Sequence, residues 1–183
     1  GDPRDILEQR GSNTRIFEDP DNTIDRVATI GLMEYCSASL QDPLFGVHLA
    51  ALQEPAVFGS VTALGQAAPT FWQALQCLVE FIPVSASPEC ELRLFVNDDV
   101  AELRWRSLIG LGDEVQTFYH GLFIVDKTLR MIGAQHFRPL GAALTCTVDR
   151  AGAEAIASAV SYWGRIVTSL SRPRSSRIFG YTR

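Results

Sequence analysis

The residues of this sequence best suited to binding chemistry are aromatic side chains that gather around one segment. Four of them fall within two helical turns: Phe118, Tyr119, His120 and Phe123. Trp105 closes an alternating apolar stretch just before this segment, and Trp72 lies in an earlier helical stretch. Small-molecule cavities are typically apolar and aromatic with a few polar anchors. This group therefore predicts a binding pocket.

Tyr119 and His120 carry polar atoms at the tips of their side chains and are expected to orient a ligand by hydrogen bonding. The pocket should lie between the inner face of the strands over residues 90–108 and the helix that follows, with Trp72 closing the other side. An aromatic stripe at helical spacing is also typical of a plain hydrophobic core. The sequence is therefore compatible with a ligand pocket or with a plain hydrophobic core.

Patterns for catalysis and metal binding are missing from the sequence. His48, His120 and His136 are isolated, and none stands at metal-ligand spacing from Cys, Asp or Glu. No partner is spaced near His48 for acid–base work, and hydrolase, protease and nucleotide-binding signatures are lacking. No metal or cofactor is expected. A rival interpretation as an enzyme has only His120 beside Tyr119 as a starting point.

Composition indicates a single globular domain over residues 1–183. The chain is 46% hydrophobic and 20% charged, with a net charge of −5. Duplex-binding domains carry excess Lys and Arg, so this chain alone should bind nucleic acid poorly. No apolar run approaches the roughly 20 residues that span a bilayer, and the polar start is not a secretory signal. Scattered cysteines indicate reduced core thiols at Cys36, Cys77 and Cys146 in a cytoplasmic protein.

Helical patterns fill the first half of the chain. A short helix is expected over residues 2–11, and Thr23 should cap a longer one over residues 23–41. Its apolar face is predicted to contain Ile24, Val27, Ala28, Leu32 and Tyr35. Asp42 and Pro43 should cap and start the next helix. A short helix should begin at Gly59, and a further helix from residue 71 should end at Pro83.

The hydrophobic period changes from about 3.6 to 2 after residue 89. Residues 90–98 and 99–108 alternate as two strands of a hairpin, with one face charged and wet and the other packed on helices. A long helix should cover residues 113–132. Strands are then expected within 137–148 and in the tail, with a small helix over 150–160. This order predicts an α+β fold in which N-terminal helices pack on a small antiparallel sheet.

One segment suggests nucleic acid as an alternative. Residues 152–175 have the apolar spacing of a helix pair and an Arg-rich end, which loosely fits a helix-turn-helix. The segment lacks a glycine turn between the two helices, and the β-branched residues 166–168 favour a strand. We therefore expect strand structure at this position.

The order and spacing of motifs resemble the N-terminal effector-binding domain of AraC-type bacterial transcription regulators. The signature starts with a D-P-x-F-G helix, matched by "DPLFGVHLA" at 42–50, and continues as "FGSVTALGQAAPTFWQAL" at 58–75. "FRPLGAALT" at 137–145 and "YWGRIVTSLSRPRSSRIF" at 162–179 match later parts. The resemblance covers nearly the whole chain. It implies that Phe45 and Val47 are core residues, that Gly46 permits close packing, and that His48 is incidental.

The resemblance implies a non-catalytic sensor domain that controls a DNA-binding module. That helix-turn-helix module is absent from this chain, so DNA is expected as a partner only through the parent protein. From the predicted pocket, we expect the effector to be a small, partly apolar molecule with one carboxylate or hydroxyl. A homodimer or weakly self-associating unit is expected, without membrane contact; the charged hairpin face could pair with its copy or could be a solvated surface. A protein-interaction module that exposes its aromatic residues is the main alternative.

Overall fold

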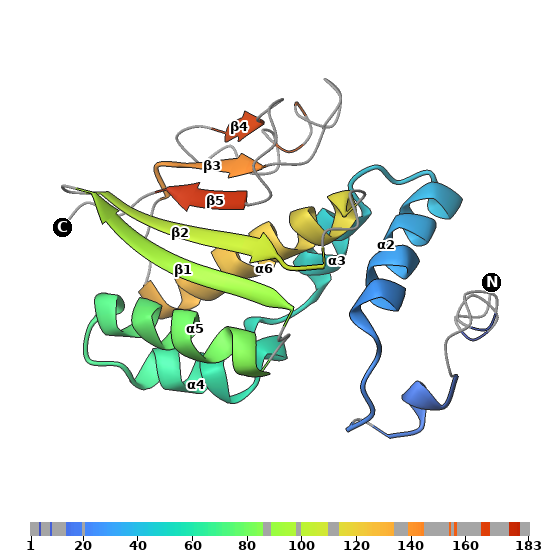
Figure 1. The fold of residues 1–183 in the computed structure, drawn as a ribbon, viewed down its shortest axis with the longest axis horizontal. Coiled ribbons are helices and arrows are strands. Elements are labelled where there is room, and N and C mark those ends of the chain that lie inside the picture. The colour runs from blue at the N-terminus through green and yellow to red at the C-terminus, as the bar shows by residue number, and fades with distance from the viewer. Residues whose placement is uncertain are drawn as a thin grey trace.

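The computed structural model describes residues 4, 8, 14–19, 21–85, 89–97, 100–109, 114–133, 139–144, 154, 156, 166–168 and 176–179. Helices and strands form separate layers in space, although α6 lies between β2 and β3 along the chain (Figure 1). The helical elements are η1 (Thr14–Phe17), α2 (Arg26–Leu40), α3 (Phe45–Leu52), η2 (Pro55–Phe58), α4 (Ser60–Ala67), α5 (Phe71–Ser85) and α6 (Val115–Gly133). The strands are β1 (Cys90–Asn97), β2 (Val100–Ser107), β3 (Gly141–Leu144), β4 (Ile166–Thr168) and β5 (Ser176–Phe179).

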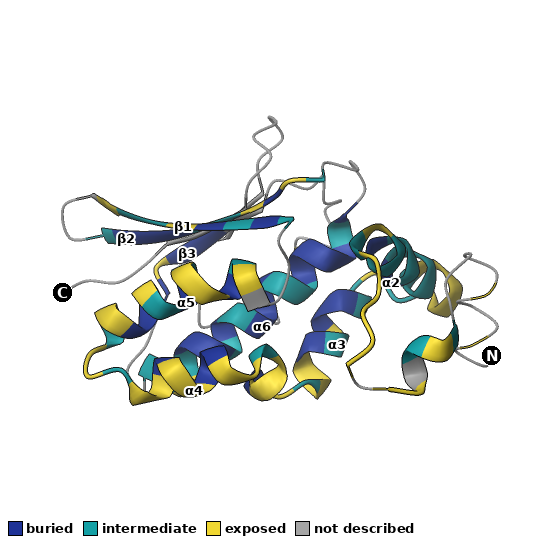
Figure 2. Ribbon diagram, turned by 60° about the horizontal axis from the view of Figure 1, so that its bottom comes forward, coloured by how far each residue is buried: buried dark blue, intermediate teal, exposed yellow. Residues whose placement is uncertain are grey.

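The five strands form one sheet in the order β1-β2-β5-β3-β4. All neighbouring pairs are antiparallel except β3 and β4, which run parallel. Helices α3 to α6 lie on one side of the sheet (Figure 2). The predicted α+β class is confirmed. The prediction of a wholly antiparallel sheet is wrong for the pair β3 and β4. The strands predicted in the tail are present at 166–168 and 176–179.

Helix α6 is the central helix of the packed layer. It contains buried residues along most of its length and contributes to two apolar clusters, one with α3 and one with α4, α5 and the hairpin. Gly46 of α3 lies so close to α6 that a Cβ atom there would stand 2.1 Å from the Gln116 carbonyl oxygen. The predicted close packing at Gly46 is confirmed, and Val47 is buried as expected.

Three helix boundaries differ from prediction for local reasons. Asp25, rather than Thr23, caps α2, because its carboxylate accepts a hydrogen bond from the Ala28 amide at 3.1 Å. Helix α3 starts at Phe45 instead of Pro43, since the Asp42 carboxylate folds the preceding turn by accepting from the Leu44 amide at 3.0 Å. Pro83 lies inside α5, which continues for one more half-turn to Ser85.

The predicted apolar face of α2 is also wrong. Ile30 and Met33 are the buried residues of this helix, whereas Ile24 and Val27 are 37% and 44% exposed. Positions three and four apart share one helix face, so the buried stripe continues back from Ile30 to Arg26. An arginine therefore occupies a position on the inward stripe.

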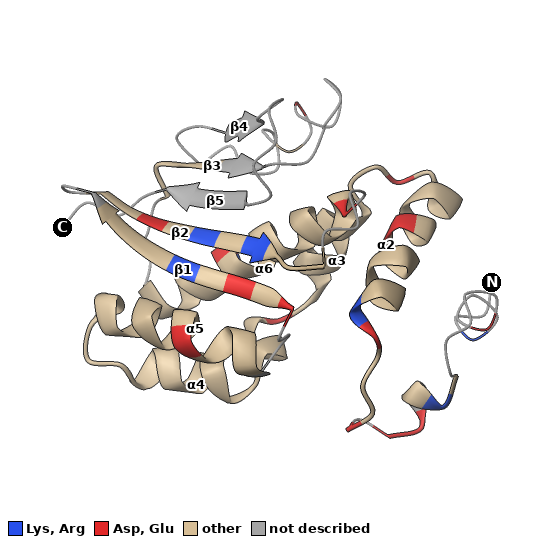
Figure 3. Ribbon diagram, viewed as in Figure 1, with Lys and Arg blue, Asp and Glu red and all other residues tan. Residues whose placement is uncertain are grey.

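The outer face of the hairpin is charged, as the alternation predicts, and Figure 3 shows the charges along β1 and β2. Arg104 pairs with Glu102 at 2.9 Å and Arg106 with Glu91 at 3.0 Å, while Arg93 also contacts Glu91. The Glu102 side chain, however, is shielded from solvent. It is 7% exposed on strand β2, which β5 flanks on its second side.

The described cysteines are free thiols. Cys36 and Cys77 are only half-buried, which corrects their prediction as core residues, and Cys90 is the buried one. Cys146 lies outside the described residues, as do most of the short helices expected at 2–11 and 150–160. Within those two segments, Arg4, Glu8, Glu154 and Ile156 are described, and all four are helical.

Candidate ligand-binding site

A partly open cavity of about 180 Å³ lies between the hairpin and α6. The hairpin contributes the inward-facing residues Cys90, Leu92, Leu103 and Trp105. Helix α6 contributes the residues from Thr117 to Val125 except Tyr119 and Phe123, and Phe58, Ile82 and Arg26 close the remaining sides. The two secondary-structure periods explain the arrangement. Side chains alternate between the two faces of a strand, so every second residue of the hairpin faces α6. Residues three or four apart share one face of a helix, so one side of α6 faces the sheet.

Trp105 is held in place from three directions. Its indole N–H donates a hydrogen bond to the Cys90 sulfur at 2.7 Å, and its ring meets Phe118 edge-on at a centroid distance of 5.2 Å. Gly121 lies behind the ring, where an added Cβ atom would stand 3.1 Å from a ring carbon. Burial raises the pKa of the Cys90 thiol, so the sulfur is protonated at neutral pH. Trp105 therefore forms a fixed aromatic wall.

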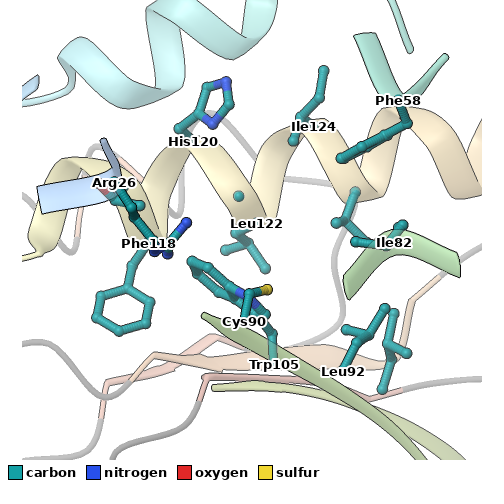
Figure 4. A pocket seen from close by; sticks show the side chains of 14 residues that line it. Arg26, Phe58, Ile82, Cys90, Leu92, Trp105, Phe118, His120, Leu122 and Ile124 are labelled. Atoms are coloured by element: carbon teal, nitrogen blue, oxygen red, sulfur yellow. The ribbon is translucent and has the colours of Figure 1, made fainter. Parts of the chain in front are cut away.

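Arg26, the first residue of α2, brings a positive charge to this cavity. Its Nε and Nη2 atoms are shielded from solvent and have no hydrogen-bond partner among the described residues. The guanidinium carbon lies 5.8 Å from the centroid of the Trp105 ring. Guanidinium groups stay protonated in proteins, so this is a charged group with unmet hydrogen-bonding capacity. Figure 4 shows Arg26 near Phe118, with Ile82 and Leu92 toward the opposite end.

His120 lies at the edge of the cavity and has another partner. Its Nε2 donates to the Gln53 side-chain oxygen at 2.5 Å, which joins α6 to the end of α3. Burial lowers the pKa of the imidazole, so the ring is neutral near pH 7. The predicted role of His120 in orienting a ligand would have to use Nδ1, because Nε2 is engaged.

The structure brings together Trp105, Phe118 and His120 of the six predicted pocket residues. Trp72, Tyr119 and Phe123 do not line the cavity. Trp72 is 38% exposed, because α5 turns a different stripe inward. Tyr119 and Phe123, four residues apart, share a stripe of α6 next to the one that faces the hairpin, and both are buried in the cluster shared with α3.

Sequence reasoning missed several wall residues. Leu92 and Cys90 were assigned to the inner strand face but not to a site, and Ile82 was assigned to no site. Arg26 was missed altogether. A usable signal existed: Arg26, Ile30 and Met33 follow helical spacing, so an arginine at the head of an apolar stripe points inward.

The described residues hold no group of three or more His, Cys, Asp or Glu side chains that could bind a metal ion. His48 does have an acidic partner, contrary to our prediction, because its Nδ1 lies 2.7 Å from Asp42 Oδ2. This pair caps the turn before α3, and the His48 side chain is 61% exposed. It lies outside the cavity lining.

Comparisons with known proteins define the class. The family model for the arabinose-binding domain of AraC transcription regulators, N-terminal, matches residues 1–161. The chain belongs to this family and is thus a regulatory domain of an AraC-type regulator. The crystal structure of the transcriptional regulator CdpR from Pseudomonas aeruginosa has a similar fold, with a TM-score of 0.55 at 12% identity. The match covers 96% of this chain and 52% of that one, so the chain spans about half the length of that regulator.

No curated protein matches this sequence. Among the described helices, none combines the length and apolar character that crossing a membrane requires.

Proposed function

We propose that this chain is the ligand-sensing domain of an AraC-type transcription regulator and that the cavity between the hairpin and α6 holds a small-molecule effector. The cavity itself carries the proposal. Its volume of about 180 Å³ exceeds the roughly 150 Å³ at which an apolar protein cavity accepts benzene. Its wall is aliphatic and aromatic with few polar groups, which is the composition of small-molecule sites.

A thermal-shift screen of metabolites tests this function. A ligand present at 100 times its Kd adds roughly 2.7 kcal/mol to the free energy of unfolding. For a chain of this length, that gain corresponds to a rise in Tm of about 5–10 °C. The assay requires only the isolated chain and a compound library.

The location of a hit is checked with two matched tryptophan variants. Trp105→Ala removes the fixed aromatic wall and should weaken the hit at least about tenfold, since burying an aromatic ring contributes well over 1.4 kcal/mol. Trp72→Ala removes the same side chain from outside the cavity and should leave the Kd unchanged. Equal affinity of both variants for the hit would mean that the effector binds elsewhere.

The proposal extends to partners and place of action. The regulator contacts DNA through a separate module of the parent protein, acts in the cytoplasm, and works as a homodimer on paired DNA half-sites. Strand β1 supports self-association, because it lies at the edge of the sheet and pairs only with β2 among the described strands. Light scattering at tens of micromolar tests the dimer, and a strictly monomeric mass would contradict it.

A further inference from the structure

We infer that Arg26 is the anchor for the effector's acidic group, and that the effector is a monocarboxylate with an apolar body. This inference rests on the proposed sensing function and narrows it to a chemical class. It assigns the polar contact to a residue on α2, in place of the Tyr119 and His120 side chains expected from the sequence.

The unmet hydrogen-bonding capacity of Arg26 is the first support. Its Nε and Nη2 atoms are out of contact with solvent and lack a partner in the part of the chain that the structure describes, although both carry hydrogens to donate. Buried donors of this kind are uncommon in native proteins, and a ligand that accepts hydrogen bonds would satisfy them. A carboxylate fits, because its two oxygens can accept two parallel N–H bonds from one guanidinium.

The charges of the cavity lining also favour a ligand with one negative charge. Arg26 is the one charged side chain among the described residues that line the cavity, and no Asp or Glu is among them. His120, the other titratable base there, is held neutral by burial and donates to Gln53. Among the described lining residues, the one positive charge of Arg26 matches a single negative charge on a ligand. A dianionic phosphate would leave a second charge buried without a partner.

The shape of the cavity sets the rest of the ligand. Arg26 lies toward one end, and Phe58, Ile82 and Leu92 lie toward the other (Figure 4). The body of the ligand must therefore be apolar and must extend away from its carboxylate. The cavity volume of about 180 Å³ limits that body to about one aromatic ring or an aliphatic group of similar size.

The experiment compares acids with their neutral amides, which match in shape but lack the charge. Isothermal titration is run with benzoate and benzamide, phenylacetate and phenylacetamide, and octanoate and octanamide. The proteins are the wild type, Arg26→Met, Arg26→Lys, and the control Arg93→Met, which removes an arginine from the outer hairpin face. Circular dichroism confirms the fold of each variant.

The wild type should bind at least one acid about tenfold or more tightly than its amide, the difference expected of a charge-assisted hydrogen bond. Arg26→Met should erase that preference and leave the amide affinity within about threefold. Arg26→Lys should keep part of the preference, because it retains the charge without the planar fork. Arg93→Met should behave as the wild type.

The two proposals fail in different ways. Amides that bind as tightly as their acids in the wild type, or an acid preference that survives in Arg26→Met, overturn the role of Arg26 while leaving a working apolar cavity. If none of the six compounds binds the wild type, the sensing cavity itself is wrong, and the anchor is wrong with it. Equal binding of acids and amides by the wild type overturns the anchor even if a variant fails to fold, whereas an acid preference is assigned to Arg26 only by its loss in Arg26→Met.

Discussion

Arg26→Met should stabilise the unliganded protein, although it removes the proposed ligand anchor. Methionine has a similar length, prefers helices, and carries no hydrogen that needs a partner. The substitution therefore keeps the packing on the inward stripe of α2 and removes a buried charge. Functional groups held without partners commonly cost stability in this way.

The size of the gain follows from the surroundings of the guanidinium. Two shielded nitrogens lack partners among the described residues. Removing each unsatisfied donor is worth about 1 kcal/mol, the low end of the range, because Arg26 is only half-buried. Removing a positive charge from the start of α2 adds about 0.3 kcal/mol. Losing the contact with the Trp105 ring at 5.8 Å costs about 0.5–1 kcal/mol. The net gain is about 1–2 kcal/mol, or a rise in Tm of about 2–8 °C.

Urea unfolding at pH 7, followed by circular dichroism, measures this change. Arg104→Met is the matched control, because it removes the same charge from a guanidinium whose Nε and Nη2 both donate to Glu102 at 3.0 and 2.9 Å. That control should lose about 1–3 kcal/mol, since the Glu102 carboxylate is buried and loses two charge-assisted bonds. A loss of more than about 1 kcal/mol in Arg26→Met would refute our description of Arg26 as an unsatisfied buried charge.

Four further predictions concern the space around two glycines, the burial of one histidine and the hydrogen bonds of one lysine. Gly46→Ala should destabilise by about 1–3 kcal/mol or more in urea unfolding, because its Cβ would stand 2.1 Å from the Gln116 oxygen. Gly31→Ala, with nothing within 4 Å, should instead gain about 0.5–1 kcal/mol. The His120 pKa is lowered in the folded state, so stability should fall as pH drops below 6.5, and an NMR titration should place its pKa below that value. Lys127→Met should cost about 1–2 kcal/mol in thermal unfolding, because Nζ donates to three carbonyls at the end of α3.

Local patterns in the sequence were sufficient to predict the hairpin and most of the helices. Strict alternation over residues 90–107 fixes which side chains face inward, because the side-chain period of a strand is two. The observed register pairs Leu92 with Trp105 and Leu94 with Leu103, as matched inner faces require. The position of the cavity between the hairpin and α6 was foreseeable for the same reason.

Features that depend on distant partners were not predictable. Asp42 and Pro43 fit a helix start, yet Asp42 satisfies the Leu44 amide and leaves the start to Phe45. The α2 face was misassigned because two apolar stripes overlap on that helix, and only packing against α6 selects the one with Ile30. Within the aromatic run of α6, neighbouring residues differ by 100° in direction, so spacing alone could not separate Phe118 from Tyr119.

The order of strands in the sheet decides when folding can finish. β5 lies between β2 and β3, yet it is the last of the described strands along the chain. Hairpin formation takes microseconds, whereas pairing β2 with β5 must close a loop of some seventy residues. During synthesis, the hairpin that forms the cavity wall therefore presents an open strand edge until residues 176–179 arrive. Until β5 is synthesised and pairs with β2, the nascent chain is prone to aggregation, because unpaired strand edges can pair with other chains.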